Sequence, residues 1–317
     1  MEQLPRYEIV RELGRGGMGA VLLGVHKSLG RQVAIKVLLG GSRVLDHELA
    51  RFCREARTYK ELLHPNLVKV YDAQLDGVLP HIVLEYIPGG DLFAELGPGV
   101  RRRIDAMSLA RAMAGALAYI HERNILHRDI KPSNILIDAD ARPVLTDFGL
   151  VKLEGADLTA LTADGSALGT LPYMAPEVLR GEPVGAPADV YSMGLTLFEA
   201  AFGRRVFTGL DPQGPGIPAT RRMTGQIPTL TQLGARVEPE LEAAIVACLA
   251  MAPESRPTGA QLAMLLDPDP AGERELPGGP EGSGRPGVPR RSTRRSRPVR
   301  VAVAPVTPPP AGRRWPM

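Results

Sequence analysis

The chain has 317 residues, 44 % of them hydrophobic, which is ample material for a core, although the length alone selects no fold. No apolar run approaches the ~20 residues that a membrane span needs, and the N-terminus lacks the pattern of a secretory signal, so we expect a soluble, cytoplasmic protein. The two cysteines, Cys53 and Cys248, form neither a disulfide framework nor a metal site by themselves, and we interpret them as buried thiols.

The first part of the chain predicts a small sheet and one helix. Short apolar-rich segments bounded by turn residues are typical of strands. These segments are 7–13, 20–26, 31–38, 67–74 and 81–86. Between the third and the fourth, apolar side chains recur three and four positions apart and predict an amphipathic helix over 47–63. Its stripe consists of Leu49, Phe52, Ala56, Tyr59 and Leu63.

After Gly89-Gly90 the hydrophobic pattern becomes mainly helical, with three clear stripes of apolar residues. They are Leu109, Met113, Leu117 and Ile120; Val190, Met193, Leu197 and Ala201; and Leu241, Ile245 and Leu249. The sequence therefore predicts a small β-rich lobe followed by a larger helical lobe.

The composition changes near residue 267. From Pro268 onward Pro, Gly, Arg and Ser dominate, and such a segment cannot bury enough apolar surface to offset its chain entropy, so we predict disorder over 268–317. The tail holds ten arginines against four acidic residues, a net charge of +6, whereas the whole chain carries +3 and residues 1–267 therefore −3. The basic run 290–297 has two interpretations: a solvated linker, which we favour, or a contact for nucleic acid or another anionic surface.

A glycine-rich segment, Gly14-Arg15-Gly16-Gly17-Met18-Gly19, leads into an expected strand. A dinucleotide-binding turn would lead into a helix instead, so that alternative is disfavoured. A glycine-rich hairpin can lay its backbone N–H groups over phosphate oxygens, although an ordinary hairpin stays open as an interpretation. On the next strand Ala34 and Lys36 share a face that looks under the hairpin, and Glu55 on the following helix is a candidate partner for the lysine.

The strongest signal is the segment His127-Arg128-Asp129-Ile130-Lys131-Pro132-Ser133-Asn134, followed by Asp147-Phe148-Gly149. Phosphoryl transfer needs a carboxylate to orient the attacking hydroxyl, ligands for Mg²⁺, and positive charge to offset the charge on the phosphoryl oxygens. Asp129 has the residue type for the first task. Asn134 and Asp147 have it for the second, and Lys131 and Lys36 for the third.

In this order, the motifs resemble those of the eukaryotic-like (Hanks-type) bacterial Ser/Thr protein kinases, from about Tyr7 to Leu266. The resemblance implies a bilobal α+β fold over residues 1–267, with an N-lobe of about 1–87 and a C-lobe of about 88–267. It implies an enzyme that transfers the γ-phosphoryl group of ATP to Ser/Thr hydroxyls of protein substrates. Its cofactors would be ATP and Mg²⁺, with Mn²⁺ as the alternative metal.

The resemblance also gives a role to each matching residue. The catalytic residues would be Lys36, Glu55, Asp129 and Lys131, and the metal ligands Asn134 and Asp147. The nucleotide-binding residues would be Leu13, Gly14, Gly16, Gly19, Val21, Ala34, Lys36, Leu84, Glu85, Ile87, Asp91 and Leu136. Among these, Leu84 falls at the gatekeeper position, and Glu85 and Ile87 fall at the hinge.

Later motifs complete the set. Glu177 in Ala175-Pro176-Glu177 would pair with Arg256, and the segment that begins at Asp189 resembles the start of the helix that anchors the catalytic loop. Lys131 followed by Pro132 resembles the Ser/Thr-directed members, in which Thr170 would position the substrate.

Arg128 beside the expected base suggests regulation, because a buried arginine there needs an anion that a phosphate can supply. The candidate phosphosites for autophosphorylation are Thr159, Thr162 and Ser166. A homodimer that phosphorylates itself in trans is a further expectation. Two other functions were weighed. A nucleotide-binding pseudokinase scaffold usually lacks Lys36, Asp129 or Asp147 equivalents, and a small-molecule phosphotransferase lacks the Ala-Pro-Glu segment and the lysine after the base.

Overall fold

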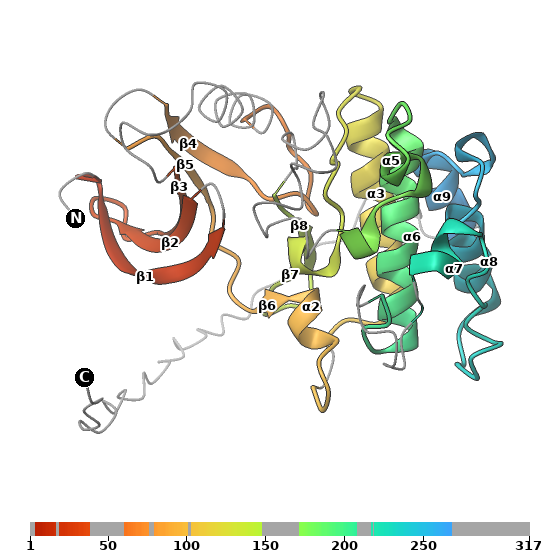
Figure 1. Ribbon diagram of the computed structural model, residues 1–317. Coiled ribbons are helices and arrows are strands. Elements are labelled where there is room, and N and C mark those ends of the chain that lie inside the picture. Colours follow the sequence, from red (N-terminus) through yellow and green to blue (C-terminus); the bar gives the residue numbers. More distant parts are fainter. Residues whose placement is uncertain are drawn as a thin grey trace, which may run out of the picture. The chain divides into compact units, whose positions relative to one another are not determined.

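The computed structural model describes residues 4–16, 19–38, 60–75, 79–100, 103–147, 171–207, 217 and 219–267. The chain divides into two units, residues 1–271 and residues 272–317. The second unit, and with it the prediction of a disordered tail, lies outside the described residues. The first unit contains all of the described residues, and its elements follow the chain from red to blue in Figure 1.

The N-terminal part forms a five-stranded antiparallel sheet with the strand order β1-β2-β3-β5-β4 (Figure 1). Its strands are β1 (Tyr7–Gly16), β2 (Gly19–His26), β3 (Gln32–Leu38), β4 (Val70–Gln74) and β5 (His81–Glu85). Alternation along β3 separates two apolar clusters, because Ile35 packs with one cluster while Ala34 and Leu38 pack with the other. The predicted strands are thus confirmed, and Ala34 faces the cluster that lies towards the C-terminal lobe.

Two predicted boundaries in this region are wrong. The fourth strand begins at Val70 rather than at residue 67, because the backbone N–H of Val68 donates to the carbonyl of Leu145, 3.0 Å away in the other lobe. The predicted helix over 47–63 lies outside the described residues up to position 59, and helical structure ends at Lys60. Leu63 is 68 % exposed and outside the helix, since Pro65 disfavours helical geometry in the residue before it.

The C-terminal part is mainly helical, as predicted. Its α-helices are α2 (Leu92–Glu95), α3 (Ala106–His121), α5 (Pro176–Leu179), α6 (Ala186–Phe202), α7 (Ala219–Met223), α8 (Pro239–Cys248) and α9 (Gly259–Leu266). The 3-10 turns are η2 (Pro132–Asn134), η4 (Leu171–Tyr173) and η5 (Pro253–Ser255). A second sheet joins β6 (Gly90–Asp91), β7 (Ile135–Ile137) and β8 (Pro143–Leu145).

The core of this lobe is built on α3 and α6, which lie side by side in Figure 1. The stripe predicted on α3 is fully buried, and α9 packs against the same helix. Glycine at position 259 allows that approach, since a Cβ atom there would lie 2.5 Å from the backbone nitrogen of Ala118. Cys248 is a buried free thiol at the end of α8, whereas Cys53 lies outside the described residues. In the parts of the chain that the structure describes, no helix is long and apolar enough to cross a membrane.

A buried ion pair fastens the start of α5 to the segment before α9. The guanidinium of Arg256 donates from Nη1 and Nη2 to the two carboxylate oxygens of Glu177, over 2.6 and 2.9 Å. Its remaining donors reach the backbone carbonyls of Ala250, Met251 and Pro187, so the group is hydrogen-bonded on every side. The predicted pairing of Glu177 with Arg256 is confirmed.

Removing one member of this pair leaves an uncompensated buried charge. We therefore expect Arg256→Met to lower the free energy of unfolding by about 3–5 kcal/mol, as other broken buried pairs do. The matched control is Arg180→Met, because Arg180 forms only an exposed 3.9 Å contact with Glu182 and should cost less than about 1 kcal/mol. Denaturant unfolding measures both values, and equal costs for the two variants would contradict the account.

Candidate active site

The nucleotide side of the candidate site is an apolar cluster shared by both lobes. Four of its buried residues are Ala34 from β3, Leu84 from β5, Ile87 from the segment after β5, and Val144 from β8. Three partly buried residues pack against the cluster: Leu13, Val21 and Leu136. The structure thus brings together six of the expected nucleotide-binding residues from five separate stretches of chain, which are β1, β2, β3, the region of β5 and β7.

The glycines differ in what the fold requires of them. A Cβ atom at Gly19 would lie 1.9 Å from the carbonyl oxygen of Val37, so only glycine allows β2 to approach β3 there. At Gly14 and Gly16 a Cβ atom would meet nothing within 4 Å. Packing therefore requires glycine at position 19, whereas packing does not require glycine at positions 14 and 16.

Lys36 and Asp147 meet across the two lobes. The Nζ atom of Lys36 donates to Oδ1 of Asp147 over 3.0 Å, although the two residues are 111 positions apart in the sequence. Asp147 directly follows Thr146 at the end of the second sheet and has a φ of 55°, a left-handed conformation that is costly for a residue other than glycine. Glu55, the expected partner of Lys36, lies outside the described residues.

Lys131 and Asn134 converge on the carboxylate of Asp129. Its Oδ2 atom lies 3.0 Å from Nζ of Lys131 and accepts a 3.0 Å hydrogen bond from Nδ2 of Asn134. The same amide nitrogen donates to the backbone carbonyl of Asp129 over 2.7 Å. Thr146 joins this group to Asp147, because its N–H donates to the carbonyl of Asn134 over 2.9 Å. The structure thus connects the two motifs that the sequence separates by a dozen residues.

Asp189 near the start of α6 holds the catalytic loop. Its buried carboxylate accepts the backbone N–H groups of His127 and Arg128, each over 2.7 Å, and contacts Nε2 of His121 at 3.1 Å. These bonds fix Arg128 at a φ of 64°, again in the left-handed region. The predicted anchoring of the loop by this helix is confirmed, whereas the part played by His121 was missed, since no motif marks it.

The environment of Arg128 bears on regulation. Its Nε atom is buried and has no hydrogen-bond partner among the residues that the structure describes. Unsatisfied buried donors are rare, so this one agrees with the expectation that Arg128 requires an anion. The candidate phosphosites Thr159, Thr162 and Ser166, together with Thr170, lie outside the described residues.

Two further residues refine the expectations. Asp91 caps α2, because its Oδ1 atom accepts the N–H of Ala94 over 2.7 Å. Arg142, which sequence reasoning missed, connects Glu85 at the end of β5 with the carbonyl of Pro65, through donors 2.9 and 2.8 Å away. The carboxylate of Glu85 is therefore engaged with Arg142, and a contact of Glu85 with a nucleotide would come from its backbone.

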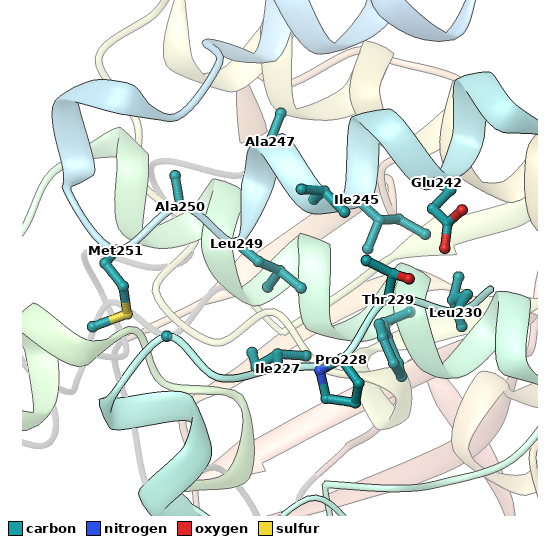
Figure 2. Close-up of a pocket in the computed structure, with 13 residues that line it drawn as sticks. Ile227, Pro228, Thr229, Leu230, Glu242, Ile245, Ala247, Leu249, Ala250 and Met251 are labelled. Carbon is teal, nitrogen blue, oxygen red and sulfur yellow. The ribbon is translucent and has the colours of Figure 1, made fainter. Parts of the chain in front are cut away.

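A separate apolar pocket of 440 Å³ lies in the helical lobe, and none of the expected site residues lines it. Figure 2 shows Ile245 and Leu249 from the α8 region facing Ile227 and Pro228 of the segment after α7. The one acidic side chain in its wall, Glu242, accepts two hydrogen bonds from Thr231. This pocket is distinct from the group of residues around Asp129.

Comparisons with known proteins agree with this geometry. Residues 7–265 match the protein kinase domain family. The chain is 36 % identical over 258 residues to the serine/threonine-protein kinase PknB of Mycolicibacterium smegmatis, which covers 79 % of the chain and 40 % of that protein. It is 37 % identical over 205 residues to the serine/threonine-protein kinase PrkC of Bacillus subtilis, which covers 64 % of the chain and 31 % of that protein. A further relative is the serine/threonine-protein kinase pkn2 of Myxococcus xanthus, 38 % identical over 212 residues, with 66 % of the chain and 26 % of the relative covered.

The bilobal α+β fold is that of the class predicted from the sequence. The chain belongs to the protein kinase family, and its relatives are bacterial Ser/Thr-protein kinases. The chain spans between about a quarter and two fifths of the length of these relatives. The family also implies ATP and a divalent metal ion as its general cofactors.

His127 next to the catalytic loop gives a pH prediction. Burial lowers the pKa of its imidazole, which contacts the carbonyl of Thr146 through Nε2 at 3.1 Å and accepts the N–H of Asp129 at Nδ1 over 3.3 Å. The native state therefore holds His127 neutral, while the unfolded chain takes up a proton near pH ~6.5. We expect the free energy of unfolding to fall as the pH drops through and below that value.

NMR titration of the His127 ring, assigned by its loss in His127→Gln, measures this directly. The expected result is a midpoint below ~6.5, together with a flatter pH dependence of unfolding in the variant between about pH 7 and 5. A midpoint at or above the ordinary histidine value would contradict a buried neutral ring.

Proposed function

We propose that this chain is a Ser/Thr protein kinase that transfers the γ-phosphoryl group of ATP to serine and threonine hydroxyls of protein substrates. The observation that carries the proposal is the convergence of Lys131 and Asn134 on the carboxylate of Asp129, a group that Thr146 joins to the Asp147–Lys36 contact. We take residues 1–267 as the catalytic unit, with an N-lobe of about 1–87, and residues 268–317 as a linker.

The nucleotide would enter between the lobes. The apolar cluster around Ala34 and Leu84 suits the flat adenine ring, and the backbone at Glu85 and Ile87 would hydrogen-bond its edge. Lys36 would hold the α- and β-phosphates. The glycines at 14 and 16, which packing does not require, would let the backbone approach the phosphates closely.

The donor set fits a divalent metal. Because the amide nitrogen of Asn134 faces Asp129, its amide oxygen is left to act as a ligand beside the carboxylate of Asp147. One carboxylate and one amide oxygen are typical of Mg²⁺, which keeps several waters and binds phosphate oxygens as well. We propose Mg²⁺, with Mn²⁺ as the alternative, and the bound ion would offset charge on the phosphates.

The chemistry of the chain's own residues centres on Asp129. Its carboxylate would accept the proton of the substrate hydroxyl and orient the hydroxyl oxygen for attack on the γ-phosphorus. As the bond from oxygen to phosphorus forms, the bond to the β-phosphate bridge breaks and ADP leaves. Lys131, 3.0 Å from Asp129, would offset negative charge on the transferred group.

The alternatives have less support. A nucleotide-binding pseudokinase scaffold would lack one of Lys36, Asp129 or Asp147, and all three are present here. Lys36 contacts Asp147, and Asp129 contacts Lys131. A small-molecule phosphotransferase would not need the Glu177–Arg256 pair, which orders the segment beyond Thr170. A protein substrate therefore fits the chain best.

The first test is transfer of label from [γ-³²P]ATP with Mg²⁺ to the protein itself and to a generic basic protein. Asp129→Asn should reduce the rate by about 10²–10⁴-fold, the usual contribution of a general base. The matched control is Asp140→Asn, an exposed aspartate in the turn between β7 and β8, which should retain the rate. Label on serine and threonine in the wild type but not in Asp129→Asn supports the proposal. Absence of label in both, with ATP bound, would favour the scaffold.

Regulation follows from Arg128. We propose that autophosphorylation at Thr162 or Ser166, with Thr159 as a third candidate, supplies the anion that its buried Nε atom requires. A homodimer would allow one copy to phosphorylate the other. Mass spectrometry of active protein should find phosphate between residues 149 and 170, and Arg128→Met should make activity independent of it. Active protein without phosphate in this segment would contradict the mechanism.

A further inference from the structure

The turn η4 (Leu171–Tyr173) is held by a buried arginine from another helix. Arg222 on α7 donates from Nη1 to the carbonyl oxygen of Pro172 over 2.5 Å, and the carbonyl of Leu171 lies 3.4 Å from the same nitrogen. Arg222 is only 3 % exposed, and its guanidinium lies 6.0 Å from the centre of the Phe207 ring. An arginine of α7 therefore fixes the backbone of residues 171 and 172.

The other end of the turn is fixed independently. The hydroxyl of Tyr173 donates to Oε2 of Glu199 over 2.7 Å, and Oε1 of that carboxylate accepts the N–H groups of Val206 and Phe207 over 2.6 and 2.8 Å. Glu199 is fully buried on α6, and burial raises its pKa. The three residues of η4 are thus attached to rigid parts of the lobe at consecutive positions.

The chemistry of Arg222 indicates more than packing. Burying a guanidinium is costly unless its charge and donors are engaged. Among the described residues, Arg222 takes part in no salt bridge, and its buried Nε atom has no hydrogen-bond partner. Burial correspondingly lowers its pKa. An apolar side chain would fill the same space at less cost, so what the arginine adds is its hydrogen bonding to the two carbonyls and an electrostatic attraction to the carboxylate of Glu199.

The location of η4 gives that contact a consequence. Leu171 directly follows Thr170 in the sequence, and the family resemblance gives Thr170 the role of positioning the substrate. We propose that Arg222 is a positioning residue for the protein substrate: it holds the backbone of residues 171 and 172 so that this segment aligns the substrate chain with the base. The inference rests on the proposed kinase function, but it assigns a separate role to a residue in no kinase motif.

This role predicts a particular pattern in the kinetics. Arg222 contacts none of the residues expected to bind ATP, so its loss should leave the KM for ATP unchanged. The KM for the protein substrate should rise about tenfold or more, because the substitution removes the charged hydrogen-bond donor that holds the backbone of residues 171 and 172. A role confined to stability would instead reduce the amount of folded protein and leave both KM values of the folded fraction unchanged.

The experiment uses the full chain with three substitutions. Arg222→Met keeps an unbranched side chain without the charge and the donors, Arg222→Lys keeps the charge and one donor nitrogen, and Arg221→Met changes the exposed arginine beside it on the same helix. Steady-state kinetics with ATP and myelin basic protein give both KM values, and thermal unfolding gives the folded fraction. The expected order of the protein KM is Arg222→Met highest, Arg222→Lys intermediate, and Arg221→Met equal to the wild type.

A second measurement does not depend on activity. The N–H of Met174 donates to the carbonyl of Leu171 over 3.3 Å, so hydrogen exchange of peptides that cover 171–179 reports the order of the turn. Exchange should be faster in Arg222→Met and unchanged in Arg221→Met. If Arg222→Met fails to fold, Arg222→Lys carries both measurements.

An unchanged protein KM together with unchanged exchange overturns the inference. So does an equal rise in the KM for ATP and the KM for protein. A wild-type chain that phosphorylates no protein contradicts the proposed function instead. In that event the hydrogen-exchange result alone decides whether Arg222 orders the turn.

Discussion

The carboxylate of Asp189 is the interaction on which the rest of the site depends. It satisfies two consecutive backbone N–H groups, those of His127 and Arg128, in the interior of the protein, where an unpaired donor is costly. In doing so it keeps Arg128 in a left-handed conformation that arginine does not otherwise favour. The direction in which Asp129 leaves the loop follows from that constraint. Because α6 is buried along most of its length, this carboxylate attaches the loop to the core of the helical lobe.

The second constraint lies where the lobes meet. Residue Leu145 of β8 pairs with Leu67 and so joins the second sheet to the backbone of the N-terminal lobe. Arg142, just before β8, adds contacts to Pro65 and to Glu85 at the end of β5. Asp147 stands two residues beyond this junction, and the Lys36 contact closes the connection from the other side. Asp147 and Lys36 are thus placed by both lobes together, whereas the contacts of Asp129 with Lys131 and Asn134 lie within the helical lobe.

Features that depend on residues close together in the sequence could be predicted from it. Short apolar-rich segments bounded by turn residues identified most strands, and helical stripes identified the core faces of α3, α6 and α8. The motifs identified Asp129, Asn134 and Asp147 as neighbours. The boundaries at Val70 and Lys60 were missed because a contact with Leu145 and the effect of Pro65 override local propensity. Arg142 and Arg222 were missed for a related reason. Each acts on backbone carbonyls about 50 to 80 positions away, and such partners leave no local pattern in a sequence.

The most direct test of this account separates nucleotide binding from phosphoryl transfer in Asp189→Ala, with Asp189→Asn as the conservative comparison. ATP affinity, measured by calorimetry on protein whose circular dichroism matches the wild type, should be unchanged, because Asp189 contacts none of the expected nucleotide residues. The single-turnover rate of phosphoryl transfer should fall by about 10²-fold or more in Asp189→Ala and by less in Asp189→Asn, which retains one acceptor oxygen. A wild-type transfer rate in folded Asp189→Ala would show that the loop does not depend on this carboxylate, and would contradict the central claim.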